Sequence, residues 1–247
     1  GAGMRVEQKG TSGFVNRMMR LLDSVEYRRV ETSEDLEAVA RIRYKAYDQI
    51  GLAPKAGSMM VDDEDFAPNA HVIGIHYEEK LVATLRIHHV TQNQKTSLAT
   101  TCFPDVMNPL LDAGRTFIDP VRFAADPQVV RDVPGIPYLT LRVATMATDF
   151  FNADYCLSVI KPNHKAFYQR VFNSRPMVES RYIERFSSMV ELYGSDAHQE
   201  LQGIYRRFPF FNSEAFERRM MFAPASAVGA PVLTVRPTAR YAQARIH

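Results

Sequence analysis

The sequence predicts an α/β (α+β) fold with a mixed, mostly antiparallel sheet that carries helices on both faces. Two patterns support this class: residues 71–90 alternate apolar and polar positions like a hairpin, and residues 137–151 repeat apolar positions at helical spacing. Further strand and helix patterns follow in mixed order, without an internal repeat. Such an order favours helices packed on an antiparallel sheet around one core.

The composition is that of an ordinary globular domain. The chain has 247 residues, of which 46% are hydrophobic and 23% are charged, so it can bury a core without metal or disulfide support. Its 30 Lys and Arg nearly balance its 28 Asp and Glu, which argues against a nucleic-acid binder. No apolar run reaches the roughly 18 to 20 residues of a membrane span. With two cysteines and no disulfide framework, we expect a cytoplasmic location.

The chain begins with a basic amphipathic segment, residues 1–24. It contains a predicted short helix over residues 13–22, and residues 1–30 hold six basic side chains against three acidic ones. Such a helix docks on its own domain, which we favour, or touches an acidic partner or a membrane surface. We assign the main domain to residues 25–195, and C-terminal helices with an irregular tail to residues 196–247.

The next elements flank a long loop. Residues 26–30 favour a strand, and a helix follows from a good cap at Thr32 to a natural stop at Gly51. Residues 51–70 show no period, and a loop of this length inside a compact domain is usually functional.

The remaining elements follow from the same patterns. A hairpin turns at Glu78-Glu79, and a linker with helical character precedes the strand after it. The expected strands are 71–77, 80–90, 116–123, 155–160 and 187–192, and the expected helices are 137–151, 164–172, 196–206 and 213–221.

Common catalytic motifs are missing from the sequence. It has no phosphate-binding loop, dinucleotide fingerprint, nucleophile elbow or zinc-protease motif. His88 and His89 are adjacent in a strand and point to opposite faces, so they cannot share a metal, and we expect no metal site. Cys102 lies in a loop without a nearby His and Cys156 in a buried strand, which gives no support to a nucleophilic role.

The strand at residues 116–123 carries unusual residues for a central apolar strand. Pro120 cannot donate to a ladder, so it indicates an edge or a bulge. Asp119 and Arg122 are three residues apart, and a one-residue bulge at Pro120 would bring both onto one face. A carboxylate base and a free backbone N–H for an oxyanion would then lie beside a cleft, as acyl transfer requires. A structural ion pair is the alternative.

A second informative stretch is residues 161–172, Lys-Pro-Asn-His-Lys-Ala-Phe-Tyr-Gln-Arg-Val-Phe. It follows a short strand and places Pro and Asn at a helix start. The pattern resembles the strand–helix unit of the GNAT acyltransferases, although its Asn-to-Tyr spacing is two residues short. The resemblance implies a GNAT-like sheet whose central strands splay apart around an acyl thioester.

The stretch that would bind coenzyme A departs from ordinary GNATs. Their loop holds a pyrophosphate with backbone amides at a helix start. The equivalent residues 131–137 include Pro134 and Pro137, which each remove one N–H. We therefore expect no tightly bound cofactor and an acyl thioester of phosphopantetheine as co-substrate. Its expected carrier is an acyl carrier protein, with coenzyme A as the less favoured donor.

The order of further motifs is similar to that of the autoinducer-synthase-like long-chain N-acyl amino acid synthases. The matching residues are Arg43 with Tyr47, Asp62 with Asp65, Arg86, and Asp119-x-x-Arg122-Phe123. Acyl-homoserine lactone synthases carry Phe in place of Tyr47 and Glu in place of Asp119, which argues against lactone synthesis. The Pro-Asn-His-x-x-Phe-Tyr-x-Arg run and Arg43-Tyr44-x-x-Tyr47 resemble the amino acid synthases better.

This resemblance implies a role for each residue. Asp119 would take the amine proton, Arg122 would orient Asp119, and Tyr168 would protonate the leaving thiolate. The implied substrate-binding residues are Arg43, Tyr47, Asp62, Asp65, Arg86 and Phe123, and the implied acyl-tunnel residues are Phe117, Met146 and Phe150. Arg43 would hold a substrate carboxylate or the acidic loop, and Arg86 would pair with a loop carboxylate. Ordinary packing or solvation is the alternative for each.

The expected function is an N-acyltransferase that moves a long fatty acyl group from an acyl carrier protein to an amino acid amine. The amine attacks the thioester directly, so no covalent enzyme intermediate is needed. The alternatives are a lactone-forming autoinducer synthase, an acetyl-coenzyme A acetyltransferase and a non-catalytic GNAT domain that binds acyl carrier protein. Basic pairs that could dock the acidic carrier are Arg17 with Arg20, Arg206 with Arg207, and Arg218 with Arg219.

Overall fold

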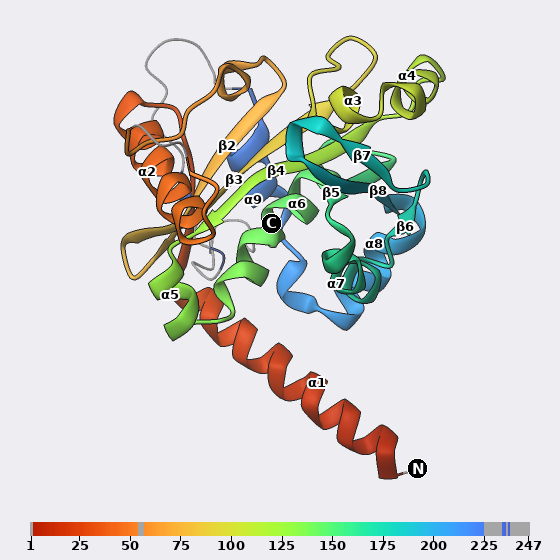
Figure 1. Ribbon diagram of the computed structural model, residues 1–247. Coiled ribbons are helices and arrows are strands. Elements are labelled where there is room, and N and C mark those ends of the chain that lie inside the picture. Colours follow the sequence, from red (N-terminus) through yellow and green to blue (C-terminus); the bar gives the residue numbers. More distant parts are fainter. Residues whose placement is uncertain (1, 54–56, 225–233, 236, 238–247) are drawn as a thin grey trace.

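A computed structural model describes residues 2–53, 57–224, 234, 235 and 237 (Figure 1). The strands are β1 Val25–Arg29, β2 Ala70–Tyr77, β3 Lys80–Val90, β4 Phe117–Ala125, β5 Tyr155–Ile160, β6 Arg175–Pro176, β7 Arg181–Ile183, β8 Ser188–Asp196 and β9 Thr234–Val235. Among the described residues they form one sheet in the order β6-β8-β5-β4-β3-β2-β1-β9, with β7 also paired to β8. β4 and β5 run parallel, and the other pairs are antiparallel, which confirms the predicted sheet.

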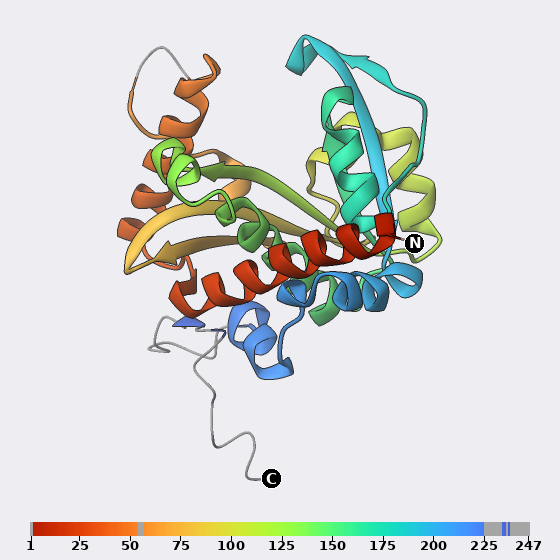
Figure 2. The ribbon, with the colours of Figure 1, turned by 90° about the horizontal axis from the view of Figure 1, so that it is seen from below.

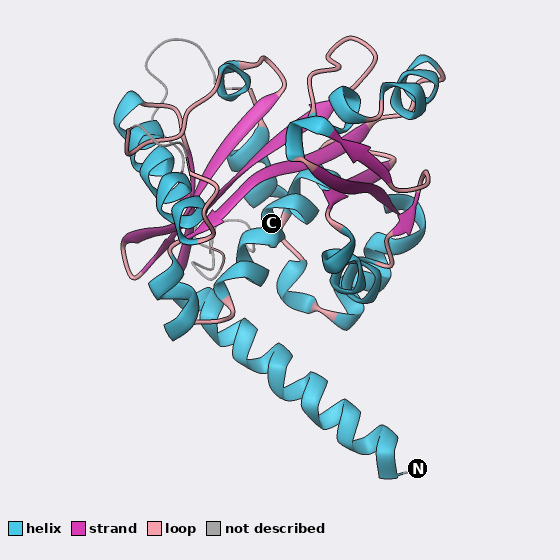
Figure 3. Ribbon diagram, viewed as in Figure 1, coloured by secondary structure: helices cyan, strands magenta, loops and turns pink. Residues whose placement is uncertain are grey.

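The helices cover both faces of this sheet (Figure 3). They are α1 Ala2–Leu21, α2 Ser33–Gln49, α3 Leu98–Cys102, α4 Pro104–Asp112, α5 Pro127–Asp132, α6 Ile136–Phe150, α7 Lys165–Phe172, α8 Ala197–Arg207 and α9 Ala215–Phe222. Within the described part of the chain, none of them is both long and apolar enough to span a membrane.

Local chemistry sets the element ends that the sequence predicted. Thr32 caps α2, and its Oγ1 accepts a hydrogen bond from the Asp35 backbone N–H at 3.2 Å. The β2–β3 hairpin turns through Glu78 and Glu79, both of which have positive φ as a two-residue turn requires. The hairpin and the helix thus begin and end where expected.

The two faces of the sheet bury different cores. α6 packs on one face of β3 and β4, and α2 packs against these strands as well. The larger core lies around α6 and includes Met18 of α1 and Phe222 of α9. Figure 2 shows α1 running across the lower side of the molecule. The N-terminal and C-terminal segments therefore bury side chains in the same core as the main domain.

β4 and β5 separate soon after they begin. Their pairing is limited to Phe117 with Tyr155 and Ile118 with Cys156, although both strands continue beyond these pairs. The central strands therefore splay, as the sequence predicted, and the sheet opens between them.

The structure also contains elements that the sequence did not predict, namely the short helix α5 and the short strands β6 and β7. The linker before β4, which was expected to have helical character, forms α3 and α4. β9 pairs with β1 in a region expected to be irregular. The rest of that tail, residues 225–233, 236 and 238–247, lies outside the described residues.

Candidate active site

The acidic loop between α2 and β2 folds onto α2 through Arg43. This side chain is 1% exposed, and its two terminal nitrogens donate to the two oxygens of Asp65 at 2.9 and 2.8 Å. It also donates to the carbonyl oxygen of Met60 at 3.2 Å. The short 3₁₀ helix Asp63–Phe66 begins here, and Asp62 and Asp65 close its start as a capping box. Of the two roles expected for Arg43, the structure shows the one that holds the acidic loop.

Arg86 of β3 ties the same loop to the sheet. One terminal nitrogen donates to Asp62 at 2.9 Å and to Asp65 at 2.8 Å, and the other donates to Glu64 at 3.1 Å. Its Nε donates to Nε2 of His88 at 2.8 Å, so every nitrogen of this buried guanidinium has a partner. Arg86 thus pairs with loop carboxylates, as the sequence suggested.

Arg122 joins the cluster from a bulge in β4. It has a φ of 52°, and the register with β3 shifts between the pairs Val121–Arg86 and Ala124–Thr84. Its Nε and Nη2 donate to the Asp62 carboxylate at 3.1 and 2.8 Å. The predicted bulge exists, but it lies at Arg122 and not at Pro120, which stays in register. Arg122 pairs with Asp62 instead of Asp119.

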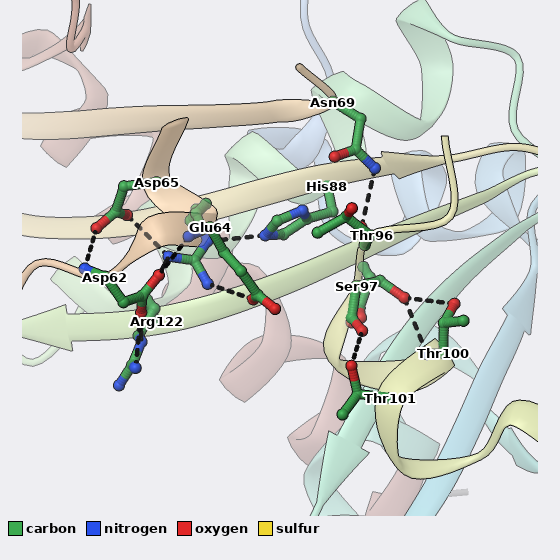
Figure 4. Close-up of polar contacts among 12 residues, drawn as sticks. Asp62, Glu64, Asp65, Asn69, His88, Thr96, Ser97, Thr100, Thr101 and Arg122 are labelled. Carbon is green, nitrogen blue, oxygen red and sulfur yellow. Dashed lines mark hydrogen bonds and ion pairs between the residues drawn. The ribbon is translucent and has the colours of Figure 1, made fainter. Parts of the chain in front are cut away.

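The opposite charges hold one another ionised. Burial would raise the pKa of Asp65, but the Arg43 guanidinium lowers it to about 2. Burial likewise opposes ionisation of Asp62, yet Arg86 and Arg122 lower its pKa below the usual range. Burial would lower the pKa of Arg122, but Asp62 and Tyr47 raise it. Figure 4 shows these carboxylates gathered around the guanidinium groups.

Asp119 lies deeper on the same side of the sheet. It is directly opposite His88 in the β3–β4 register, and its side chain is fully buried. Oδ2 accepts a hydrogen bond from the backbone N–H of Ala99 in α3 at 2.9 Å, whereas Oδ1 has no protein partner. Burial raises the pKa of Asp119 to about 7. Asp119 therefore has the free lone pair and the proton affinity of a general base.

Some polar residues near Asp119 had no role at the site in the sequence analysis: His88, and the side chains that hold the segment before α3. Nδ1 of His88 is buried without a partner, on the side of the sheet that carries Asp119. Asn69 donates to the carbonyl oxygens of His89, Gln94 and Thr96, and Ser97 caps α3 (Figure 4). The only sequence signal was the adjacent His pair, which was considered solely as a metal ligand.

The opposite face of β4 borders a cavity between the splayed strands. This cavity, of about 60 Å³, is lined by Pro120 and Phe123 of β4 and by residues 156–160 of β5, together with Leu141, Tyr168 and others. A wider cavity of about 300 Å³ shares Phe123, Leu141 and Tyr168 with it and reaches Asn163 and His164. Together they form an apolar path from the surface into the gap between β4 and β5.

The three residues expected to line an acyl tunnel lie elsewhere. Phe117 and Met146 are fully buried in the two cores, on opposite sides of the sheet. Phe150 packs against Phe151 and Phe222 at the end of α6. None of the three lines either cavity of this path, whereas Phe123 and Tyr168 line both.

The described cysteines and the side chains of metal-ligand type are placed as follows. Burial raises the pKa of the Cys156 thiol to about 12 and also raises that of Cys102, so neither forms a ready thiolate. Within the described ranges, no group of three His, Cys, Asp or Glu side chains is placed to hold a metal.

The start of α6 is covered by another helix. A Cβ at Gly135 would come within 2.5 Å of Met18 and 2.8 Å of Leu21, both on α1. Phe14 of α1 stacks edge-on against Tyr138 one turn later. Pro137 also lies in the first turn and removes one backbone N–H from this helix start.

Comparison with known proteins places this geometry in context. The sequence profile described as N-acyl amino acid synthase FeeM matches residues 38–196, which include the charged cluster, Asp119 and Tyr168. No curated protein sequence matches the chain.

Solved structures share the fold at low sequence identity. FeeM, an N-acyl amino acid synthase from uncultured soil microbes, is 16% identical over 71% of this chain and 92% of its own, with a TM-score of 0.57. BjaI, a coenzyme A-dependent acyl-homoserine lactone synthase, is 13% identical over 72% and 83%, with a TM-score of 0.54. The acyl-homoserine lactone synthase LasI is 12% identical over 72% and 91%, with a TM-score of 0.54. These similarities confirm the fold class.

Proposed function

The chain belongs to the FeeM family of N-acyl amino acid synthases, and we propose that it transfers a long fatty acyl group from an acyl carrier protein to the amine of an amino acid. The observation that carries this proposal is the pairing of an apolar cavity between β4 and β5 with a buried carboxylate and a charged cluster on the other face of β4. The acyl chain of the thioester needs the apolar cavity, and the attacking amine needs the carboxylate and the charged groups next to it.

The start of α6 favours a carrier protein over coenzyme A as the acyl donor. Coenzyme A would place its pyrophosphate there, where Pro134 and Pro137 lack N–H groups and α1 covers Gly135. A phosphopantetheine arm on a carrier protein needs only the apolar path. The mouth of that path is flanked by exposed basic side chains, Lys161 and Lys165 beside Asn163 and His164, and an acidic carrier would be drawn to them.

The three arginines differ in exposure, and this difference suggests where the amino acid acceptor binds. The side chains of Arg43 and Arg86 are 1% and 3% exposed, and their terminal nitrogens are hydrogen-bonded to loop carboxylates. Arg122 is 29% exposed and holds Asp62 through one edge of its fork. We assign the carboxylate of the amino acid to Arg122, because a guanidinium can bind a second carboxylate through its remaining nitrogen. Tyr47 and Asp62 border this position.

The reaction follows from these placements. The amine nitrogen attacks the thioester carbonyl, a C–N bond forms, and the C–S bond breaks. Asp119, through a bridging water, takes the proton that the amine loses. A backbone N–H at the Arg122 bulge stabilises the oxyanion, and Tyr168 returns a proton to the leaving thiolate. The products are an N-acyl amino acid and the carrier protein, whose phosphopantetheine arm now ends in a free thiol.

Lipid extracts from a bacterial host test the proposed function. Expression of the chain should produce new N-acyl amino acids that mass spectrometry detects by their amide fragments. Expression of Asp119→Asn at the same level should reduce them strongly. Soluble, well-expressed protein that yields no such lipids, or lipids whose amount ignores Asp119→Asn, would overturn the proposal.

A further inference from the structure

A second, smaller cavity lies directly behind the cavity between β4 and β5. It measures about 20 Å³, room for roughly one water molecule. Its lining comes from α6, α8, β5, β8 and the end of α7: Thr145, Thr148, Cys156, Phe172, Ser195, Ala197, Leu201 and Ile204. Three of these, Cys156, Phe172 and Ser195, also line the larger cavity, so they form the wall between the two.

Phe172 is the largest side chain of this wall, and it is firmly held. It is 9% exposed and contacts Tyr168 on one side and Phe211 on the other, with ring centres 6.2 and 5.3 Å apart. The Ser195 hydroxyl donates to the Phe172 carbonyl oxygen at 2.7 Å. Asn173 then ends α7 in the left-handed conformation and donates to Glu200 of α8 at 2.8 Å. These bonds fix the backbone that carries the Phe172 ring, and the ring packs against its aromatic neighbours.

The hydroxyl groups that line this smaller, rear cavity already have hydrogen-bond partners, so the cavity offers mainly apolar surface. The hydroxyl of Thr148 donates to the Ala144 carbonyl oxygen within α6. The hydroxyl of Thr145 lies 2.8 and 2.9 Å from the carbonyl oxygens of Arg142 and Phe211 and donates its one proton to either of them. The Ser195 hydroxyl donates to the backbone carbonyl oxygen of Phe172. Water needs two to four polar partners to occupy a buried site stably, whereas a hydrocarbon tail needs only apolar contact. The side chains of Leu201 and Ile204 supply it.

We propose that Phe172, with Cys156, closes the inner end of the acyl-chain site and so sets the longest acyl group that the enzyme accepts. This inference rests on the proposed function. Removing the ring would join the rear cavity to the front one and admit a longer chain. Phe172 is thus a specificity-determining residue, and it takes no part in the bond-forming step.

The test compares product chain lengths for Phe172→Leu and Phe172→Ala with the wild type by mass spectrometry of N-acyl amino acids. Each additional methylene group that the acyl chain buries should raise its binding affinity about fourfold. Two extra methylenes should therefore shift the ratio of longer to shorter products by on the order of tenfold. Phe222→Leu is the matched control, because Phe222 is buried in the same core, packs against Phe150 and Phe151, and lines neither cavity; its product lengths should stay those of the wild type.

A reciprocal variant and a donor-free assay separate the possible failures. Cys156→Phe fills the inner end and should shorten the products. Calorimetric titration with saturated fatty acids of increasing length should show the tightest-binding length rise in the Phe172 variants. Unchanged product lengths in folded Phe172 variants overturn the inference and leave the proposed function intact. A shifted fatty-acid preference without any N-acyl amino acid from the wild type supports the wall and overturns the proposed function.

Discussion

The two faces of β4 are built by different forces. On one face, three arginines and three acidic residues are joined by hydrogen bonds of 2.8 to 3.1 Å, and Asp119 lies buried on the same side. On the other face, the cavity between β4 and β5 is lined mainly by apolar side chains. The charged face fixes a loop and a proton acceptor in one geometry. The apolar face offers volume, which side-chain size can tune without disturbing the charges.

The largest effect should come from the base. Asp119→Asn keeps the shape and the hydrogen bond from Ala99 but removes the proton acceptor, so turnover should fall by about 10²- to 10⁴-fold. Wild-type activity should rise with pH through about 7, where Asp119 loses its proton. Steady-state rates over a pH series measure both. A folded Asp119→Asn variant with a normal rate would remove Asp119 from catalysis.

The same variant has a predictable stability profile. Because burial raises the pKa of Asp119, the folded state favours its protonated form, and the associated stability is lost as pH rises from 3.8 to about 7. Asp119→Asn should therefore unfold at a similar or higher temperature than the wild type above pH 7. This outcome distinguishes a base from a structural ion pair, whose loss would lower the melting temperature.

The next largest effect should come from breaking the charged face. Arg43→Met leaves the buried Asp65 without its bidentate partner, and such a loss typically costs about 3–5 kcal/mol. Arg41→Met on the same helix is the control, since its ion pair with Glu37 is exposed and should contribute at most about 0.5 kcal/mol. Urea unfolding measures both. Equal stabilities would show that the cluster does not hold the loop.

Acid should loosen the charged face at a defined pH. The pKa of Asp65 is lowered from 3.8 to about 2, so its contribution to stability is present above pH 3.8 and is lost as pH falls through about 2. The contribution amounts to about 2 kcal/mol. Asp65→Asn should lack this part of the acid dependence, which unfolding curves between pH 2 and 5 would reveal. Parallel curves for both proteins would contradict the assignment.

The smallest effect should come from the surface around the apolar path. Arg17 and Arg20 are exposed on α1, whose Met18 and Leu21 cover the start of α6. Reversing both to Glu should weaken the apparent affinity for acyl carrier protein by several-fold at low salt and flatten its salt dependence. The Arg206 and Arg207 pair of α8 provides a comparison at another surface. Identical salt profiles for wild type and both reversals would exclude these pairs as docking sites.

The difference between the two faces also explains what the sequence revealed. Charged residues are costly in a buried strand, so Arg86, Asp119 and Arg122 stood out, and the structure gathers them with Arg43, Asp62 and Asp65. Apolar lining residues obey the same periodicity as core residues. Phe117 and Met146 were therefore expected to line a tunnel, whereas the cavity between β4 and β5 is lined by other residues, among them Leu141 and Phe172. The position of the bulge depended on the pairing of β3 with β4, which no local pattern encodes.

The most direct test of the account is an assay with purified protein, an amino acid mixture and a long-chain acyl group on either carrier protein or coenzyme A. We predict that mass spectrometry finds N-acyl amino acids, that they form at least about tenfold faster from the carrier protein, and that Asp119→Asn suppresses them by about 10²-fold or more. Folded protein that forms no amide from either donor would contradict acyl transfer to amino acids. Equal rates from both donors would contradict the assignment of the carrier.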